Sequence, residues 1–212
     1  MAHYDLEEQE QIDSIKTWWK MYGNLVTGVV TAACIAVIGW QGWNWYQRNQ
    51  AAQASVVYSV LEQAVAAQDM QKVKAAAGEL AEKFGGTSYA ALGTLLAAKQ
   101  SFEAGDLKTA RTQLQWAADH AKDELRDVAR LRLAAVLFDE KSYDDAAKQL
   151  DAAHATTFDA RFLELKGDIL LAQGKKSEAR TAYQAAQAKH AGKRSAGSEL
   201  LQQKLDKLGE AA

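Results

Sequence analysis

Side chains that commonly carry chemistry are few and scattered in this chain of 212 residues. The histidines are His3, His120, His154 and His190, and no two of them have the spacing of a zinc-binding pair. The single cysteine, Cys34, can form no disulfide within the chain, so cysteine usage does not identify a redox compartment. The sequence has neither a glycine-rich phosphate loop nor a nucleophile elbow. We therefore predict no catalytic, cofactor-binding or metal-ligating residues.

Paired carboxylates could act as a general acid and base, and two such pairs stand out. Asp139 precedes Glu140, and Asp144 precedes Asp145. Both pairs adjoin expected helix ends, where solvation and the favourable charge at a helix terminus account for them. The sequence thus predicts a protein that is not an enzyme.

The charge balance argues against one class of partner. Residues 47–212 hold 23 basic and 22 acidic residues, which is close to neutral. A nucleic-acid-binding domain needs a basic face that neutralises phosphates. We therefore expect no nucleic acid partner.

The elements that position any binding residue are predicted to be helices throughout. The chain has no proline, is rich in Ala, Leu, Gln, Lys and Glu, and has few β-branched residues. Residues 96–119, 133–153 and 167–187 align as a helix, a short turn and a second helix. The turn positions Gly105, Lys141 and Gly174 recur at intervals of 36 and 33 residues, and a weaker copy has its turn at Gln68 and Asp69.

Small residues recur where the two helices of each segment are expected to touch. The second helices carry a small residue with a large one four places on, and the first helices carry a small residue opposite: Ala110 and Leu114 with Ala98, Ala146 and Leu150 with Ala134, Ala179 and Tyr183 with Gly167. This pattern resembles the tetratricopeptide repeat, which implies a stacked α-solenoid. No repeat ends in proline, and the first helices lack the usual tryptophan. A loose bundle of Ala-rich helical hairpins is the alternative.

The last helix is expected to cap the solenoid, because a terminal repeat needs a polar outer side. Its predicted apolar stripe is Leu200, Leu201, Leu205 and Leu208, and its predicted water-facing residues are Gln202, Gln203, Lys204 and Lys207.

A solenoid without an active site usually binds partners through the first helix of each repeat. Counting from the small contact residues places the following candidate partner-binding residues on that inner face: Leu95, Lys99, Phe102, Leu131, Ala135, Phe138, Glu164, Asp168 and Leu171. Phe102 and Phe138 fall at equivalent positions. Packing between repeats is the equally weighted alternative for both rings.

Residues 23–46 are predicted to form one transmembrane helix. No charged residue lies between Leu25 and Trp40, and aromatic residues flank the stretch on both sides, as expected at the two headgroup layers. A buried core helix would keep a polar stripe, and a signal peptide would open with basic residues, whereas residues 1–15 contain none. Within the span, Gly28 and Ala32 are candidate contacts to another helix in the lipid bilayer.

Basic residues near the span set its expected orientation. Lys16 and Lys20 precede the span, whereas Arg48 is the only basic residue soon after it. This bias favours residues 1–22 as a cytoplasmic tail and residues 47–212, beyond the single span, as a domain across the membrane, which is in the periplasm if the host is a Gram-negative bacterium. The connection from Gln47 to Ser55 contains no helix breaker and is expected to continue the helix.

Taken together, the chain resembles the YfgM family of ancillary subunits of the bacterial SecYEG translocon. The segments that carry the resemblance are "YDLEEQEQIDSIKTWWKMYGN" and "YQRNQAAQAS". The resemblance implies association with SecYEG and with PpiD, a membrane-anchored periplasmic chaperone, and transfer of translocated proteins to periplasmic chaperones. It also implies a role of the cytoplasmic tail in restraining the stress-response regulator RcsB. A scaffold for another envelope complex that does not contact unfolded clients is the competing hypothesis.

Overall fold

The computed structural model describes residues 6–190 and 196–210, and within these ranges it is helical with no strand. The elements are α1 (Leu6–Ala66), α2 (Met70–Phe84), α3 (Ser88–Glu103), α4 (Leu107–His120), α5 (Asp123–Asp139), α6 (Tyr143–Leu150), a 3₁₀ turn (Thr156–Phe158), α7 (Asp159–Ala172), α8 (Lys176–Lys189) and α9 (Ala196–Glu210). The predicted all-α class is confirmed for these residues. The chain divides into two compact units, Met1–Asn49 and Gln50–Ala212, which are described separately.

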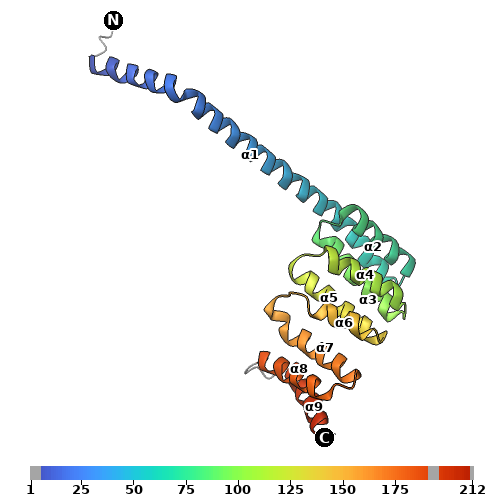
Figure 1. Ribbon diagram of the computed structural model, residues 1–212. Helices are drawn as coiled ribbons and strands as arrows, with labels where there is room; N and C mark the ends of the chain where they lie inside the picture. Colours follow the sequence, from blue (N-terminus) through green and yellow to red (C-terminus); the bar gives the residue numbers. More distant parts are fainter. Residues whose placement is uncertain (1–5, 191–195, 211–212) are drawn as a thin grey trace. The chain divides into compact units, whose positions relative to one another are not determined.

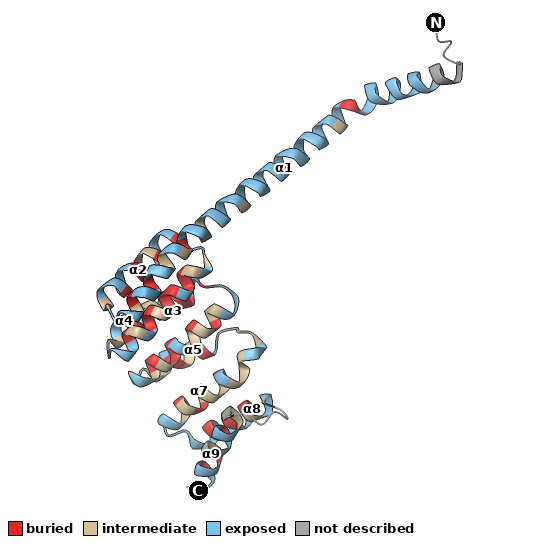
Figure 2. Ribbon diagram, turned by 180° about the vertical axis from the view of Figure 1, so that it is seen from behind, coloured by how far each residue is buried: buried red, intermediate tan, exposed pale blue. Residues whose placement is uncertain are grey.

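The described part of the first unit belongs to α1 and buries almost nothing (Figure 2). Its large apolar side chains are exposed, and Val37 and Ile38, for example, are 66% and 70% exposed. At each end of the uncharged stretch two aromatic rings lie close, Trp18 with Tyr22 at 5.8 Å and Trp43 with Tyr46 at 6.1 Å between centroids. Within the described residues, α1 is a helix long and apolar enough to cross a membrane.

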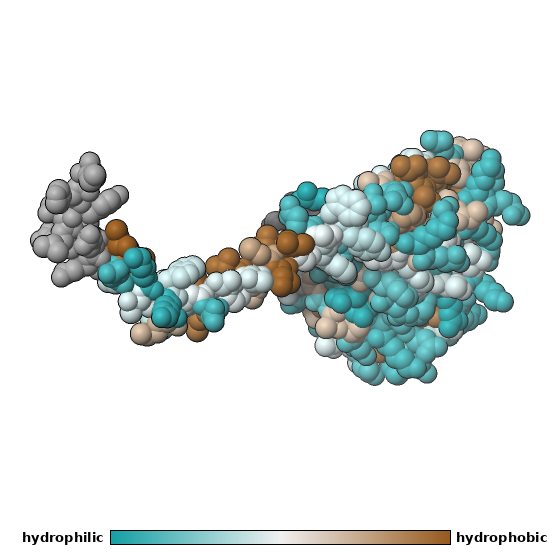
Figure 3. Space-filling view, turned by 90° about the horizontal axis from the view of Figure 1, so that it is seen from above, coloured by the Kyte–Doolittle hydropathy of each residue, from teal (hydrophilic) through white to brown (hydrophobic). Residues whose placement is uncertain are grey.

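Helices of the second unit follow one another in chain order as antiparallel pairs (Figure 1). Residues 50–66 of α1 pair with α2, and then α3 pairs with α4, α5 with α6, and α7 with α8, before α9 closes the series. As Figure 3 shows, the visible surface of this unit is largely hydrophilic. Apolar side chains gather instead where the helices face each other.

All four hairpin turns have one local geometry. Gln68, Gly105, Lys141 and Gly174 adopt positive φ angles of 55°, 78°, 61° and 79°. In each turn the next residue donates its backbone N–H to the carbonyl five residues earlier, as Asp106 does to Ser101 at 2.9 Å. This pattern is the Schellman motif, which ends one helix and starts the next at once. The predicted turns, including the weaker copy at Gln68, are confirmed.

Small residues bring the paired helices together. Ala98, Ala110, Ala134, Ala146 and Ala179 are all buried. At Gly167 an added Cβ would overlap the ring of Tyr183, so the missing side chain makes room for the aromatic ring. The predicted contact residues are therefore buried as expected, and the close approach of α7 and α8 depends on glycine.

The capping helix α9 differs from its prediction at one apolar position. Leu201, Leu205 and Leu208 are buried against the α8 residues Ala179, Tyr183 and Ala186. Leu200 was expected in the same stripe but is 47% exposed. Positions 201, 205 and 208 have helical spacing and share one face, whereas Leu200 lies beside that face. The stripe therefore has three leucines.

Candidate partner-binding site

An apolar residue stands three positions before every hairpin turn. The four equivalent residues are Val65, Phe102, Phe138 and Leu171. Phe102 and Leu171 are 42% and 38% exposed. Phe138 is only partly exposed, because it packs on the central core and its ring lies 5.8 Å from that of Tyr143. Equivalent backbone positions therefore give unequal surfaces, and Phe102 is the more accessible of the two phenylalanines.

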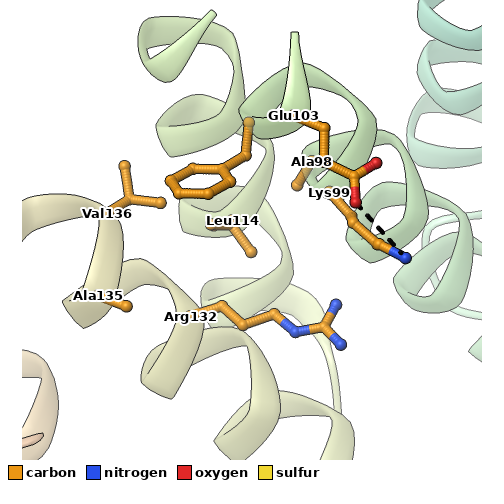
Figure 4. A pocket seen from close by; sticks show the side chains of 8 residues that line it. Ala98, Lys99, Glu103, Leu114, Arg132, Ala135 and Val136 are labelled. Atoms are coloured by element: carbon orange, nitrogen blue, oxygen red, sulfur yellow. Dashed lines mark ion pairs between the residues drawn. The ribbon is translucent and has the colours of Figure 1, made fainter. Parts of the chain in front are cut away.

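Phe102 borders a surface hollow of about 380 Å³ between α3 and α5 (Figure 4). Its lining, here called the α3–α5 hollow, consists of Ala98, Lys99, Phe102, Glu103, Leu114, Arg132, Ala135 and Val136. Five of these residues are apolar, and Leu114 rises from α4 to form part of the lining. The hollow therefore offers an apolar interior that polar side chains border.

The charged side chains at the hollow are accessible to a ligand. Figure 4 shows the nitrogen ends of Lys99 and Arg132 on the same side of the hollow. Lys99 lies 3.7 Å from Glu103, and both side chains are more than half exposed, so this pair is weak. Arg132 has no ion pair or hydrogen bond from its guanidinium within residues 6–190 and 196–210. The sequence prediction missed Arg132, although it lies one turn before Ala135 on the same helix face.

Two other predicted residues on α3 and α5 belong to the core. Leu95 is 4% exposed within the central core cluster, so it stabilises the domain and presents no surface to a partner. Leu131 is partly buried and packs against the same cluster. Leu95 lies three residues before the buried contact Ala98, which places both on one apolar stripe.

The acidic residues of the third repeat are bound by the chain itself. Lys204 of α9 lies 2.9 Å from Glu164 and 2.7 Å from Asp168. Tyr183 donates its hydroxyl to Asp168 at 2.7 Å. Lys204 is thus not the water-facing residue that the sequence predicted, because two carboxylates draw it toward α7. Glu164 and Asp168 consequently hold the capping helix, and neither carboxylate is free.

Two pKa shifts accompany this network. Burial raises the pKa of the Tyr183 phenol far above its usual value, and the hydrogen bond to Asp168 adds to the rise. Burial alone lowers the pKa of Lys204, but hydrogen bonds to Asp168 and Glu164 outweigh it and leave the pKa raised. Both shifts favour a neutral phenol and a charged ammonium at physiological pH.

Two of the described histidines, His120 and His154, stack on aromatic rings. His154 stacks on Phe162 with centroids 3.9 Å apart and lies 3.3 Å from Asp159, and His120 stacks on Trp116. Among the described residues, no group of three or more His, Cys, Asp or Glu could hold a metal ion. His3 lies outside the described residues.

In the first unit, Gly28 and Ala32 lie on an open helix surface. Nothing lies within 4 Å of a Cβ added at Gly28, and Ala32 is exposed. Their proposed contact with another helix in the bilayer remains a prediction.

Comparison with known proteins covers nearly the whole chain. A family model described as a tetratricopeptide repeat-like domain matches residues 16–210. The chain is 33% identical to the ancillary SecYEG translocon subunit of Haemophilus influenzae over 201 residues, which are 94% of this chain and 95% of that protein. It is 34% identical to the subunit of the same name from Neisseria gonorrhoeae, over 96% of this chain and 98% of that protein. The chain is 32% identical to the subunit of the same name from Escherichia coli K12, over 95% of this chain and 96% of that protein. The chain belongs to this family of ancillary SecYEG translocon subunits.

Membership in the ancillary subunit family confirms the predicted resemblance. The matching model also confirms a tetratricopeptide repeat-like domain, so the loose helical bundle is set aside. Because the match begins at residue 16 and ends at residue 210, it includes both the candidate span and the capping helix α9.

Proposed function

We propose that this protein is a non-enzymatic adaptor of the SecYEG translocon in a bacterial inner membrane. The observation that carries the proposal is similarity along almost the entire chain to three proteins named as ancillary SecYEG translocon subunits. The candidate span supports it further, since a membrane anchor raises the local concentration of the repeat domain beside other membrane proteins.

In this proposal the repeat domain helps to transfer translocated proteins to periplasmic chaperones. The α3–α5 hollow supports this role, because Phe102 and two cations are accessible there beside an apolar interior. The membrane-anchored chaperone PpiD is the proposed partner in the periplasm. The cytoplasmic tail is proposed to restrain RcsB.

This role requires the N-terminus in the cytoplasm and residues 47–212 in the periplasm. Lys16 and Lys20 supply the charge bias for that orientation. A C-terminal reporter that is active only in the periplasm should be active, and protease added to spheroplasts should remove the repeat domain. Protection of the domain from protease would overturn the orientation.

Co-purification from membranes tests the association itself. Full-length tagged protein solubilised in mild detergent should carry SecYEG and PpiD with it. If the span makes the contact, Gly28→Leu with Ala32→Leu should reduce the recovered translocon while leaving membrane insertion unchanged. Absence of SecYEG from the wild-type purification would contradict the proposal.

A scaffold for another envelope complex is the second candidate function. It is favoured by one observation, namely that on the predicted inner face Leu95 is buried in the core and both Glu164 and Asp168 are ion-paired with Lys204. If the protein is a scaffold, the same partners should co-purify with it in the same amounts whether or not protein export is active. An adaptor for clients would lose part of its recovered material when export is blocked.

A further inference from the structure

The inner faces of α3 and α7 differ in charge at equivalent positions. Six residues before the turn stands Lys99 in α3, Ala135 in α5 and Asp168 in α7. Asp168 is neutralised by Lys204 at 2.7 Å. Lys99 has only the weak contact with Glu103 at 3.7 Å, and Arg132 lies beside it. The α3–α5 hollow therefore carries a net positive charge, whereas the α7 end is neutralised within the chain.

An apolar interior next to two cations defines the chemistry of a ligand. The side chains of Phe102, Leu114 and Val136 can cover one large aliphatic or aromatic group. The guanidinium of Arg132 presents a planar fork that suits a carboxylate, and the Lys99 ammonium adds a second positive charge. A ligand that matches both features carries an apolar group and a carboxylate close together.

We infer that the α3–α5 hollow binds an extended polypeptide segment in which an acidic side chain stands two residues from a large apolar one. In an extended chain, residues i and i+2 project to the same side, so both groups can enter together. This inference rests on the proposed function, because a polypeptide crossing the translocon exposes internal segments before its C-terminus. The carboxylate is accordingly that of Asp or Glu.

A peptide-binding measurement on the full-length protein in lipid nanodiscs tests this inference. The probe is a fluorescent peptide, Gly-Ser-Leu-Ser-Asp-Ser-Gly, with both termini blocked so that only the Asp side chain is charged. Replacing its Asp by Asn should weaken binding about 5- to 10-fold, since a charge-assisted contact is lost. Replacing its Leu by Ser should weaken binding at least as much. Salt raised from about 0.05 to about 0.5 M should weaken only the acidic peptide.

Protein variants provide the matched arm. Arg132→Gln and Lys99→Gln should each weaken the acidic peptide about 3- to 10-fold and leave the Asn peptide unchanged. The control is Lys176→Gln, an exposed lysine on α8 that does not line the α3–α5 hollow, and this variant should bind like the wild type. If Arg132→Gln does not fold, Lys99→Gln and the peptide series still test whether the α3–α5 hollow binds the acidic peptide.

Three results would overturn the inference. These are no binding of the acidic peptide, equal binding of the Asp and Asn peptides, and equal losses in Lys176→Gln and Arg132→Gln. Translocon co-purification, measured on the same membranes, separates the two proposals. Intact co-purification with failed peptide binding removes this inference alone, whereas lost co-purification removes the proposed function.

Discussion

The hairpins α3–α4 and α7–α8 share one backbone design but present different surfaces. Both end their first helix in a Schellman turn, at Gly105 and at Gly174, and both pair a small residue with a larger one on the second helix. In the first hairpin Ala98 and Leu114 are buried in the core and form part of the lining of the α3–α5 hollow. In the second, Gly167 admits the whole ring of Tyr183, whose hydroxyl reaches Asp168.

This difference shows how a repeat can change role without changing backbone. In α7–α8 the larger side chain fills the space, and Lys204 of α9 neutralises the acids. In α3–α4 the smaller Leu114 packs in the core with Ala98, and a hollow whose two cations have no strong partner lies next to them, between α3 and α5. The acidic side chains of the terminal repeat therefore stabilise the domain, whereas we propose the α3–α5 hollow as the binding surface.

The largest effect is expected when the ring that fills α7–α8 is removed. Tyr183 is fully buried, so Tyr183→Ala should destabilise the protein by about 3 to 5 kcal/mol. Leu114→Ala at the equivalent position should cost about 1 kcal/mol less, since no hydrogen bond is lost with it. Urea unfolding of the full chain in detergent, followed by circular dichroism, measures both. Equal losses would remove the distinction between the two hairpins.

Enlarging the small contacts should give the next largest effect. Gly167→Ala should destabilise by about 1 to 3 kcal/mol, because its Cβ would overlap the Tyr183 ring. Ala146→Leu at the buried contact of α5–α6 should fall in the same range of about 1 to 3 kcal/mol. The exposed Ala172→Leu serves as control and should change stability by less than about 0.5 kcal/mol. Uniform tolerance would contradict tight packing of the paired helices.

Loss of the Lys204 ammonium should have a smaller, pH-dependent effect. Lys204→Met leaves Glu164 and Asp168 without their cation and should destabilise by about 1 to 2 kcal/mol at neutral pH. Because the folded-state pKa of Lys204 is raised, its contribution is complete below about pH 10.4 and decreases as the pH rises through the folded-state pKa. Thermal unfolding of the wild type and of Lys204→Met between pH 7 and 11 measures the difference in their stability. A constant gap above pH 10 would contradict this role.

The smallest change in stability is expected at the open hollow. Phe102→Ser should destabilise by less than about 1 kcal/mol, since 42% of the side chain is already exposed. Phe138→Ser should cost more, because that ring packs on the core and on Tyr143. Recovery of clients and of PpiD should nevertheless decrease for Phe102→Ser. A large fall in its melting temperature would identify Phe102 as a core residue and end its assignment to binding.

Sequence periodicity was sufficient to predict the turns and small contacts, but not all of the site. Gly105, Lys141 and Gly174 could be predicted because a hairpin needs a residue with positive φ at a fixed place. Spacing alone predicts Leu95 on the inner face, but Leu95 shares an apolar stripe with Ala98 and is buried. A small rotation of the helix about its axis decides whether a residue at the edge of the stripe is buried or exposed.

The contacts of Lys204 could not be read from periodicity. They join residues 36 and 40 positions apart, and only the packing of α9 brings them together. Arg132 was missed for a related reason, because its equivalents in α3 and α7 are Leu96 and Leu165, which are apolar. A charged residue such as Arg132, at a position where the other repeats have leucine, is therefore a signal for the site that the repeat pattern alone does not give.

Site-specific photo-crosslinking in living cells tests the account most directly. A photoreactive residue at position 102 in the α3–α5 hollow is compared with one at position 176 on α8, in cells that are exporting proteins. We predict that position 102 crosslinks to newly exported polypeptides, that Arg132→Gln reduces these products, and that position 176 yields few. No products from position 102, or equal products from both positions, would contradict a client-binding hollow between α3 and α5.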